Sequence, residues 1–489
     1  MSDEYKWKRV CMVILCVPFL FSCATYHHKM AVYYKQVVRT TQYDEALKVL
    51  DNNNYIQQSR NKFLYFIEKG MVQHLANNYD SSNYYLNLAD AFLDIQKRTS
   101  ADFIKSVTIN PTMQKYLGEP FDPFFIHYYK SLNYLYLNKM DDAIVEARRI
   151  GLQNKLLLDT YKNPQKKYTT DAFATILQGL LYEIAGDINN AFIAYRNAAD
   201  IFINAKSMYY GVSMPLQLKK DVIRTASQMG FIDIAQQYRT KFSFSDTTVV
   251  ANKSFAEAII FIEQGWSPIK NEQNFVLSRD GYGNSDFYYF DANGNRISIP
   301  FDNGFYRNMY GNTFSANSVN VTRIALPYYV VQTNNTMAPT VLVNSFAYTT
   351  ELVQNINALA LTTLQERQVT EIAHAIARQI AKKLIERASK EAATAIAKST
   401  SDSKDEKKKQ KDAEMAGIIT GLAVNLFNTA TEKADTRSWL TLPAYINYVR
   451  VPLQEGSNNI VLECGNEKKT ITCVATAKQS VQVLHYRFK

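Results

Sequence analysis

The pattern of hydrophobic and polar residues divides the chain into a helical half and a mixed half. Between residues 23 and 245, apolar residues recur every three or four positions, which predicts amphipathic helices. Residues 246–345 are rich in Tyr, Phe, Asn and Gly, and their short alternating runs predict β-strands. Residues 346–435 return to a helical period, and residues 436–489 alternate again as a small antiparallel sheet. We expect an α+β fold in which this last segment completes one domain with residues 246–345.

One segment of the helical half, residues 175–200, fits a tetratricopeptide repeat. Small Gly179 and Ala191 would let two antiparallel helices approach closely, and Gly186 would supply the left-handed turn between them. Tyr182 and Tyr195 would fill the groove between neighbouring helical hairpins. Weaker, irregularly spaced copies centre on Ala46, Ser82, Ala143 and Ala235. This pattern predicts a solenoid whose concave face binds peptides or proteins, and a helical bundle without true repeats is the alternative.

A long helix is predicted from about Thr349 to Lys398. Its apolar stripe includes Val369, Ile372, Ile376 and Ile380, and basic residues occupy its other sides. We expect the stripe to pack against the rest of the protein, although a basic helix of this kind can also lie on a membrane. His374 has no partner nucleophile or ligand cluster, which favours a structural role. A charged linker at 399–414 and a short apolar helix at 416–430, too short to span a bilayer, follow.

Two further tracts of the mixed half predict β structure. Residues 286–301 form a predicted hairpin with Asn293-Gly294 as its turn. The same turn carries Asp291 and Asn295, but its glycine is misplaced for a calcium loop and no glutamate stands at the twelfth position. Calcium binding is therefore not expected. Residues 319–331 predict a further strand.

The N-terminus indicates the compartment. Lys6, Lys8 and Arg9 precede an apolar run at residues 10–21, which suits a signal peptide and is too short for a membrane-spanning helix. Residues 20–24, LFSCA, resemble a bacterial lipoprotein processing site, except that Phe21 departs from its usual pattern. The resemblance implies a signal peptide at 1–22 and a diacylated Cys23 that anchors the mature chain. Ala24 follows the cysteine without an acidic run, which favours the periplasmic face of the outer membrane over the cell surface.

The cysteine count agrees with an oxidising compartment. Cys11 and Cys16 would leave with the signal peptide, and Cys23 would be acylated. The remaining pair, Cys464 and Cys473, lies between two β-rich runs, so we predict a disulfide across a hairpin. Two reduced, buried thiols are the alternative.

Composition and charge narrow the functional classes. The 47% hydrophobic fraction supports a sizeable core, and the net charge of +10 would be compatible with an anionic partner. Five lysines fall in the 399–414 linker, but acidic residues are interleaved with them, so we expect no nucleic-acid partner. The sequence contains no nucleophile-elbow, zinc-protease, phosphate-loop or dinucleotide motif. We predict no catalytic, metal or cofactor site. A cell-wall hydrolase or glycosidase with paired carboxylates in the β-rich half is the alternative.

Several short tracts carry a family resemblance. They are EQGWSPIK at 263–270, IALP at 324–327, IARQIAKKL at 376–384, ADTRSW at 434–439 and LP at 442–443. Together they resemble an uncharacterised family of bacterial envelope lipoproteins with degenerate tetratricopeptide-like repeats, a family without an established activity. We associate it loosely with lipoproteins that regulate peptidoglycan synthases. Asp435 to Trp439 could be a functional signature, but we favour a structural Asp435–Arg437 contact beside a buried Trp439.

These observations predict an adaptor rather than an enzyme. The expected partners are outer-membrane lipid, through the acyl chains on Cys23, and other envelope proteins, through the helical repeats. The expected role is in cell-wall or envelope assembly.

Overall fold

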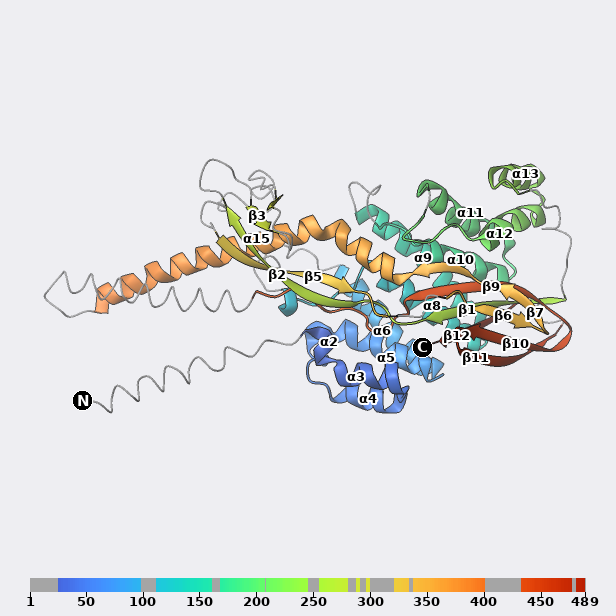
Figure 1. Ribbon diagram of the computed structural model, residues 1–489, viewed down its shortest axis with the longest axis horizontal. Helices are drawn as coiled ribbons and strands as arrows, with labels where there is room; N and C mark the ends of the chain where they lie inside the picture. The colour runs from blue at the N-terminus through green and yellow to red at the C-terminus, as the bar shows by residue number, and fades with distance from the viewer. Residues whose placement is uncertain are drawn as a thin grey trace.

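The computed structural model shows helices in the N-terminal half and sheets mainly in the C-terminal half (Figure 1). It describes residues 25–97, 111–160, 168–206, 208–244, 255–279, 287–290, 296–299, 321–333, 337–400, 432–476 and 481–488. The mixed helix-and-sheet class predicted from the pattern is confirmed. Among the described residues, no helix combines the length and the apolar character needed to cross a bilayer.

The helical half is a series of helices in which each packs against the next one along the chain. It begins with three short segments and α4: α2 (Tyr26–Lys29), α3 (Ala31–Lys35), η2 (Gln36–Thr40) and α4 (Tyr43–Asn52). Helical hairpins follow, built from α5 (Lys62–Leu75), α6 (Tyr79–Lys97), α8 (Asp122–Tyr136), α9 (Met140–Thr160), α10 (Ala172–Ile184), α11 (Ile188–Asn204), α12 (Leu216–Gln228) and α13 (Ile232–Lys241). Single 3-10 turns lie at η3 (Ser59–Asn61) and η4 (Pro111–Met113).

The predicted small residues do let α10 and α11 approach closely. A Cβ on Gly179 would lie 2.7 Å from the ring of Tyr195, and Ala191 is fully buried. Gly186 takes a φ of 81° in the turn between the helices, as predicted. Tyr182 is half-buried and packs against the same core.

The strands form three four-stranded sheets. The central sheet has the order β12 (Val481–Phe488), β1 (Ala256–Gln264), β9 (Tyr445–Leu453), β8 (Glu351–Asn355). The outer sheet has the order β11 (Glu467–Ala475), β10 (Gly456–Cys464), β6 (Thr340–Val343), β7 (Phe346–Thr349). The third sheet has the order β4 (Arg296–Ile299), β3 (Phe287–Phe290), β2 (Ile269–Arg279), β5 (Val321–Val330).

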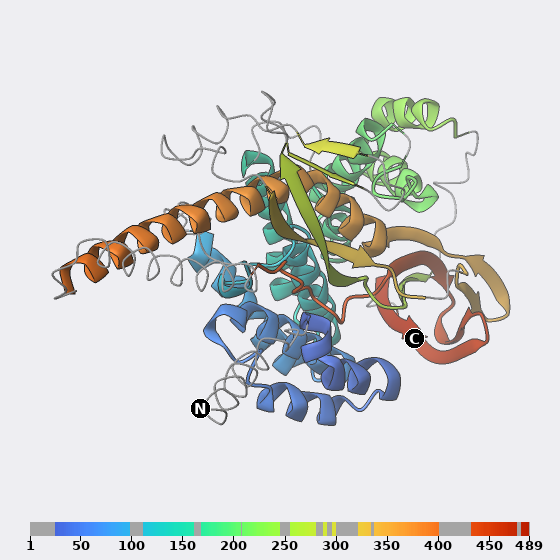
Figure 2. The same ribbon diagram turned by 60° about the vertical axis from the view of Figure 1, so that its left-hand side comes forward.

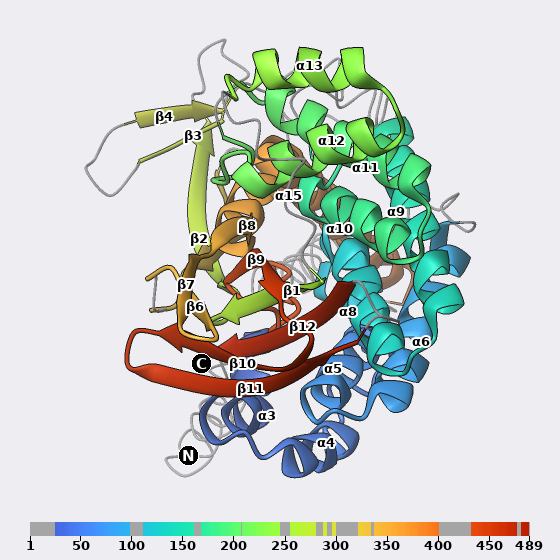
Figure 3. The same cartoon turned by 90° about the vertical axis from the view of Figure 1, so that its right-hand side faces the viewer.

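Both faces of the central sheet are covered. On β1, Ile259 and Phe261 belong to the core shared with the helices, whereas Ile260 and Ile262 belong to the core shared with the outer sheet. Burial on both faces explains why β1 is almost continuously apolar instead of alternating. Figure 3 shows the helices in an arc around β1, β9 and β12, with β10 and β11 on the other side.

Two predicted boundaries are wrong. Residues 346–355, expected to be helical, form β7 and β8, and the long helix α15 (Ile356–Thr400) begins only afterwards. Residues 436–489 do not form a sheet of their own. β9 and β12 flank β1 in the central sheet, with β12 parallel to it, whereas β10 and β11 join the outer sheet. Strand partners are set by long-range packing, which the local pattern does not encode.

The third sheet lies beside α15, which extends beyond the rest of the described fold (Figure 2). The predicted hairpin is present, since Phe290 pairs with Arg296, but its turn with Asp291, Asn293 and Asn295 lies outside the described residues. Pro327 sits on β5, an edge strand, where the missing N–H is tolerated. The predicted linker after Thr400 and the helix at 416–430 also lie outside the described residues.

Candidate functional site

The inner face of the helical arc, where the sequence placed a ligand, is occupied by the central sheet. The ring of Phe261 on β1 lies 5.8 Å from that of Tyr128 on α8 and 6.0 Å from that of Phe173 on α10. The hydroxyl of Tyr129 donates to Glu263 on the same strand over 2.8 Å. The expectation of an open concave surface is therefore corrected, because the chain's own strands fill it.

A buried ionic cluster fastens β9 to two of these helices. The guanidinium of Arg450 lies 2.6 Å from Glu183 on α10 and 2.7 Å from Asp221 on α12, and its Nε lies 2.8 Å from Glu257 on β1. Arg224 adds contacts of 2.8 Å to both Glu183 and Asp221. Burial alone would raise the pKa of Glu183, but the two guanidinium groups lower it to about 2.

A second buried cluster centres on Glu263. His485 on β12 places Nε2 3.1 Å from this carboxylate, and an Arg487 nitrogen lies 3.6 Å from it. Burial opposes the ionised form, yet the charges of His485 and Arg487 hold the pKa of Glu263 at about 2. The ring of His74 on α5 lies 5.1 Å from that of His485 at an interplanar angle of 55°, and burial followed by the charge of His485 lowers the pKa of His74 to about 3.

Three of the tracts that carry the family resemblance, at 263–270, 434–439 and 442–443, meet at this junction. Ser267 donates from its Oγ to the carbonyl of Trp439 over 3.0 Å and from its N–H to the carbonyl of Leu442 over 2.8 Å. The guanidinium of Arg487 stacks 3.8 Å above the ring of Trp266 and donates to the carbonyls of Gly265 and Thr441. The residues at 263–270 and 434–443 thus hold buried backbone together.

The predicted Asp435–Arg437 contact beside a buried Trp439 is confirmed. Arg437 forms a 2.6 Å ion pair with Asp435 and donates to Asn61 and to the carbonyls of Pro111 and Gln114. The guanidinium carbon of Arg437 lies 5.2 Å from the centre of the Tyr116 ring, and Trp439 is almost completely buried. A side chain with so many partners positions its surroundings and is not available to a ligand.

The carboxyl group of Glu68 on α5 has an unusually high pKa. Its carboxylate is fully buried and accepts hydrogen bonds from Tyr33, the Leu440 N–H and Thr441 over 2.7–3.0 Å. Burial raises the pKa to about 7 despite these donors. No sequence pattern points to this site, because an isolated glutamate in a helix does not reveal what surrounds it.

Two carboxyl groups line a small cavity, but they come from the helical half and not from the β-rich half where the hydrolase alternative places its site. Glu119 and Asp122 line the cavity together with Tyr329 and Trp439, and it has room for about one water molecule. Lys270 and Arg367 pair with Glu119, so burial is outweighed and its pKa falls to about 2. Burial and the charge of Glu119 raise the pKa of Asp122 well above its usual range. The cavity is too small for a sugar ring.

The predicted disulfide is absent. Cys464 pairs in register with Glu467 and Cys473 with Asn458, so the two cysteines sit six positions apart along β11. At about 3.4 Å per residue this separates their backbones by roughly 20 Å, beyond the reach of a disulfide. The hairpin turns directly after Cys464, which is why that cysteine cannot face Cys473. Both are buried thiols without a disulfide bond, as in the stated alternative, and burial raises the pKa of each.

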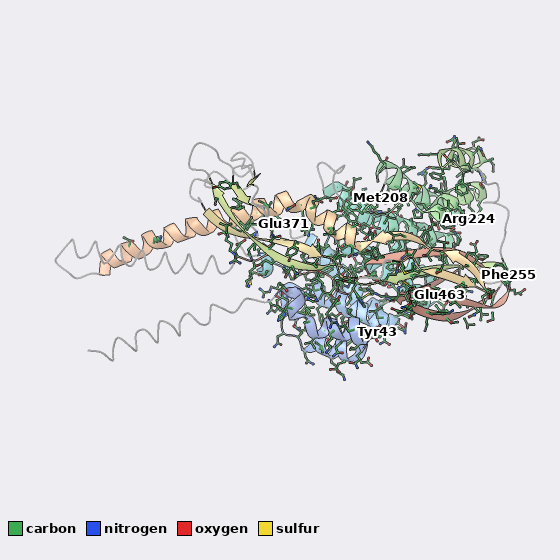
Figure 4. The ribbon with its side chains drawn as sticks, in the orientation of Figure 1. Tyr43, Met208, Arg224, Phe255, Glu371 and Glu463 are labelled. Carbon is green, nitrogen blue, oxygen red and sulfur yellow. The ribbon has the colours of Figure 1, made fainter. Side chains whose placement is uncertain are left out.

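Several apolar side chains are exposed on the outer helices. Tyr84 and Ile95 on α6 are 60% and 59% exposed, and Val145 and Leu152 on α9 are 45% and 57% exposed. Arg149 on α9 contacts Asp90 over 2.5 Å and Asp94 over 3.8 Å, which places α6 beside α9. A groove between β5 and α15, lined by Tyr328 and Leu364 and reaching Glu371, is a smaller apolar opening (Figure 4).

The described fold begins immediately after the predicted acylation site. Thr25 caps α2 through a 3.5 Å hydrogen bond from the His28 N–H, and Tyr26 is 1% exposed. Cys23 itself lies outside the described residues. Within the described part of the chain, no group of three or more His, Cys, Asp or Glu side chains is placed to hold a metal ion. Comparisons of this chain with protein-family models and with curated proteins find no match.

Proposed function

We propose that this protein is a lipid-anchored, non-catalytic adaptor on the periplasmic face of the bacterial outer membrane. Acyl chains on Cys23 would hold it there, and its helical hairpins would form a tetratricopeptide-like solenoid that binds another envelope protein. The role would lie in cell-wall or envelope assembly. The signal-like N-terminus and the apolar outer surface of the hairpins support this proposal.

The observation that carries the adaptor role is the exposed apolar surface on α6 and α9. Tyr84, Ile95, Val145 and Leu152 are exposed on two adjacent helices, whereas the inner face of the arc is filled by the central sheet. Exposed apolar side chains next to charged ones, here Arg149 with Asp90 and Asp94, are typical of protein-binding surfaces. We therefore place the partner on the outer side of the arc.

Photocrosslinking in living cells tests this assignment. A photoreactive amino acid would replace Tyr84 or Leu152, and Phe346, 68% exposed on the outer sheet, would be the matched control position. We expect the two helical positions to yield the same adduct with one envelope protein, identified by mass spectrometry, and the control to yield none. Leu152→Asp should remove the Tyr84 adduct. Adducts that arise equally from Phe346 would contradict the proposal.

A further inference from the structure

Only one residue, Ala24, separates the predicted acylation site at Cys23 from Thr25, the first described residue. Cys23 is two residue steps from Thr25, and a fully extended chain spans at most about 3.6 Å per residue. The Cα atom of Cys23 therefore lies within about 7 Å of that of Thr25, wherever residues 23 and 24 point. A flexible spacer that would let the body swing away from an anchor is missing from the sequence at this point.

Helix α2 is not available as a flexible tether either, because hydrogen bonds connect it to distant parts of the chain. The Tyr26 N–H donates to Thr436 Oγ1 over 3.0 Å, and the amide of Asn53 donates to the Lys29 carbonyl over 3.2 Å. Just beyond α2, the Tyr34 hydroxyl donates to Gln332 over 2.6 Å. Releasing α2 as a tether would break these contacts and expose Tyr26.

We propose that the surface around the start of α2 rests directly on the lipid headgroups and fixes the orientation of the whole protein on the bilayer. This inference rests on the acylation of Cys23 in the proposed function. We call this surface the membrane face and define it as the start of α2, residues 53–60 and residues 433–436. Two acyl chains would enter the bilayer at Cys23, so the start of α2 would lie within the reach of two residues from the headgroup layer.

The chemistry of the membrane face suits an anionic lipid surface. Lys29 places its ammonium 4.1 Å from the centre of the Tyr55 ring, and His28 is exposed beside it. Arg60 adds a half-buried cation near Tyr55, and the acidic Asp435 is paired with Arg437. Cations near anionic headgroups and a tyrosine at the interface both favour contact with a membrane.

Contact between the membrane face and the bilayer would place the opposite end of the protein far from the lipid. Tyr43 lies among the helices next to α2, whereas Met208 and Arg224 lie on the opposite side of the body (Figure 4). Figure 3 agrees, with α3 and α4 at one end of the molecule and α12 and α13 at the other. An anchored protein should therefore hold Asn54, an exposed residue of the membrane face, at the headgroups and Met208 away from them.

Collisional quenching by lipids tests the orientation. The acylated protein, purified from cells with its signal peptide processed, would carry a fluorophore at Asn54→Cys or Met208→Cys. Vesicles would contain phosphatidylglycerol and a lipid with a nitroxide on its headgroup. The unsubstituted chain, whose two thiols are 3% and 4% exposed, gives the labelling background. We expect quenching at position 54 to be severalfold greater than at position 208.

A matched variant isolates the effect of the short connection. A 20-residue Gly/Ser insertion after Ala24 has a root-mean-square span of about 25 Å, so the ratio of quenching at positions 54 and 208 should fall towards one. Equal quenching at the two positions in protein that floats with the vesicles would overturn the orientation while leaving anchoring intact. Protein that carries no acyl mass on Cys23 and does not float would overturn the proposed anchoring as well.

Discussion

The two faces of the central sheet differ in chemistry although they share the same strands. The face toward the outer sheet packs Ile260, Ile262, Val449 and Val451 against Val341, Ile460 and Leu462, all apolar. The face toward the helices combines aromatic rings with the buried charges of Glu263, Arg450 and His485 and the partly exposed Glu257. An apolar face tolerates small shifts, whereas each buried charge needs its partner in one place. We attribute the fixed position of the helices on the sheet to the charged face.

The largest expected effect is a cavity on the apolar face. Ile260→Ala should lower the free energy of unfolding by about 4 kcal/mol, because Ile260 is fully buried between two sheets that cannot close the gap. Ile260→Val, the control, should cost about 1 kcal/mol. Both are measured by denaturant titration. A cost for the alanine variant as small as that for valine would mean that the two sheets do not pack as described.

On the charged face, Arg450→Met should cost about 3 kcal/mol, because Glu183 and Asp221 would keep Arg224 alone as their counter-charge. The control is Lys468→Met, which removes a 2.8 Å ion pair with Glu463 at the surface and should cost below about 1 kcal/mol. Denaturant titration of the two variants side by side gives the comparison. Equal costs would show that the buried cluster does not hold the helices to the sheet.

The buried carboxyl group of Glu68 on α5 should also make the stability of the protein depend on pH. Its pKa is about 7 in the folded protein against an ordinary value of 4.5, so the folded state keeps a proton that the unfolded state has released. This group therefore destabilises the fold as pH rises from 4.5 to 7, by about 3 kcal/mol in total. Glu68→Gln should remove that component from unfolding curves measured between pH 5 and pH 8. Parallel pH profiles for both proteins would contradict the assignment.

Within the helical layer, Gly179→Ala should cost about 1–2 kcal/mol, because the added methyl would meet the Tyr195 ring at 2.7 Å. Gly151→Ala on α9 is the matched control, since its methyl would meet only the movable amide of Gln178. That variant should be neutral or stabilised by up to about 1 kcal/mol through helix propensity. Melting temperatures of the two variants should move in different directions. A Gly179→Ala variant as stable as the Gly151→Ala variant would place α10 and α11 farther apart than described.

The smallest expected effect concerns the thiols on the apolar face. Reductant should leave the melting temperature unchanged, because Cys464 and Cys473 are not joined. Alkylation of denatured protein without reductant should then modify both residues, as seen by peptide mass spectrometry. A linked peptide containing both cysteines would overturn the register of β10 and β11.

Local sequence patterns were sufficient for several features. Gly179, Gly186 and Ala191 predicted a close helical hairpin, because side-chain size and backbone freedom act between near neighbours in the chain. The β3–β4 hairpin and β5 also followed from local alternation. The helix predicted from Thr349 began late, because residues 351–355 pair with β9, and a distant strand overrode the local preference.

The candidate sites were less predictable. The tracts at 263–270 and 434–443 stood out in the sequence, but their role followed from Ser267 and Arg487 binding distant backbone. Glu68 and Arg450 gave no signal, because their pKa shifts and ion pairs depend on partners hundreds of residues away along the chain. The repeat pattern predicted a ligand on the concave face. The sequence could not show that strands of the same chain fill this face.

The sequence by itself determined the mixed class, the helical hairpins and a candidate acylation site at Cys23. Only the tertiary structure decided that β12 lies parallel to β1, that the central sheet fills the helical arc, and that Cys464 and Cys473 stay apart. The reason is physical: periodicity, capping and turn chemistry act over a few residues, whereas strand pairing and charge burial depend on which distant surfaces exclude water together.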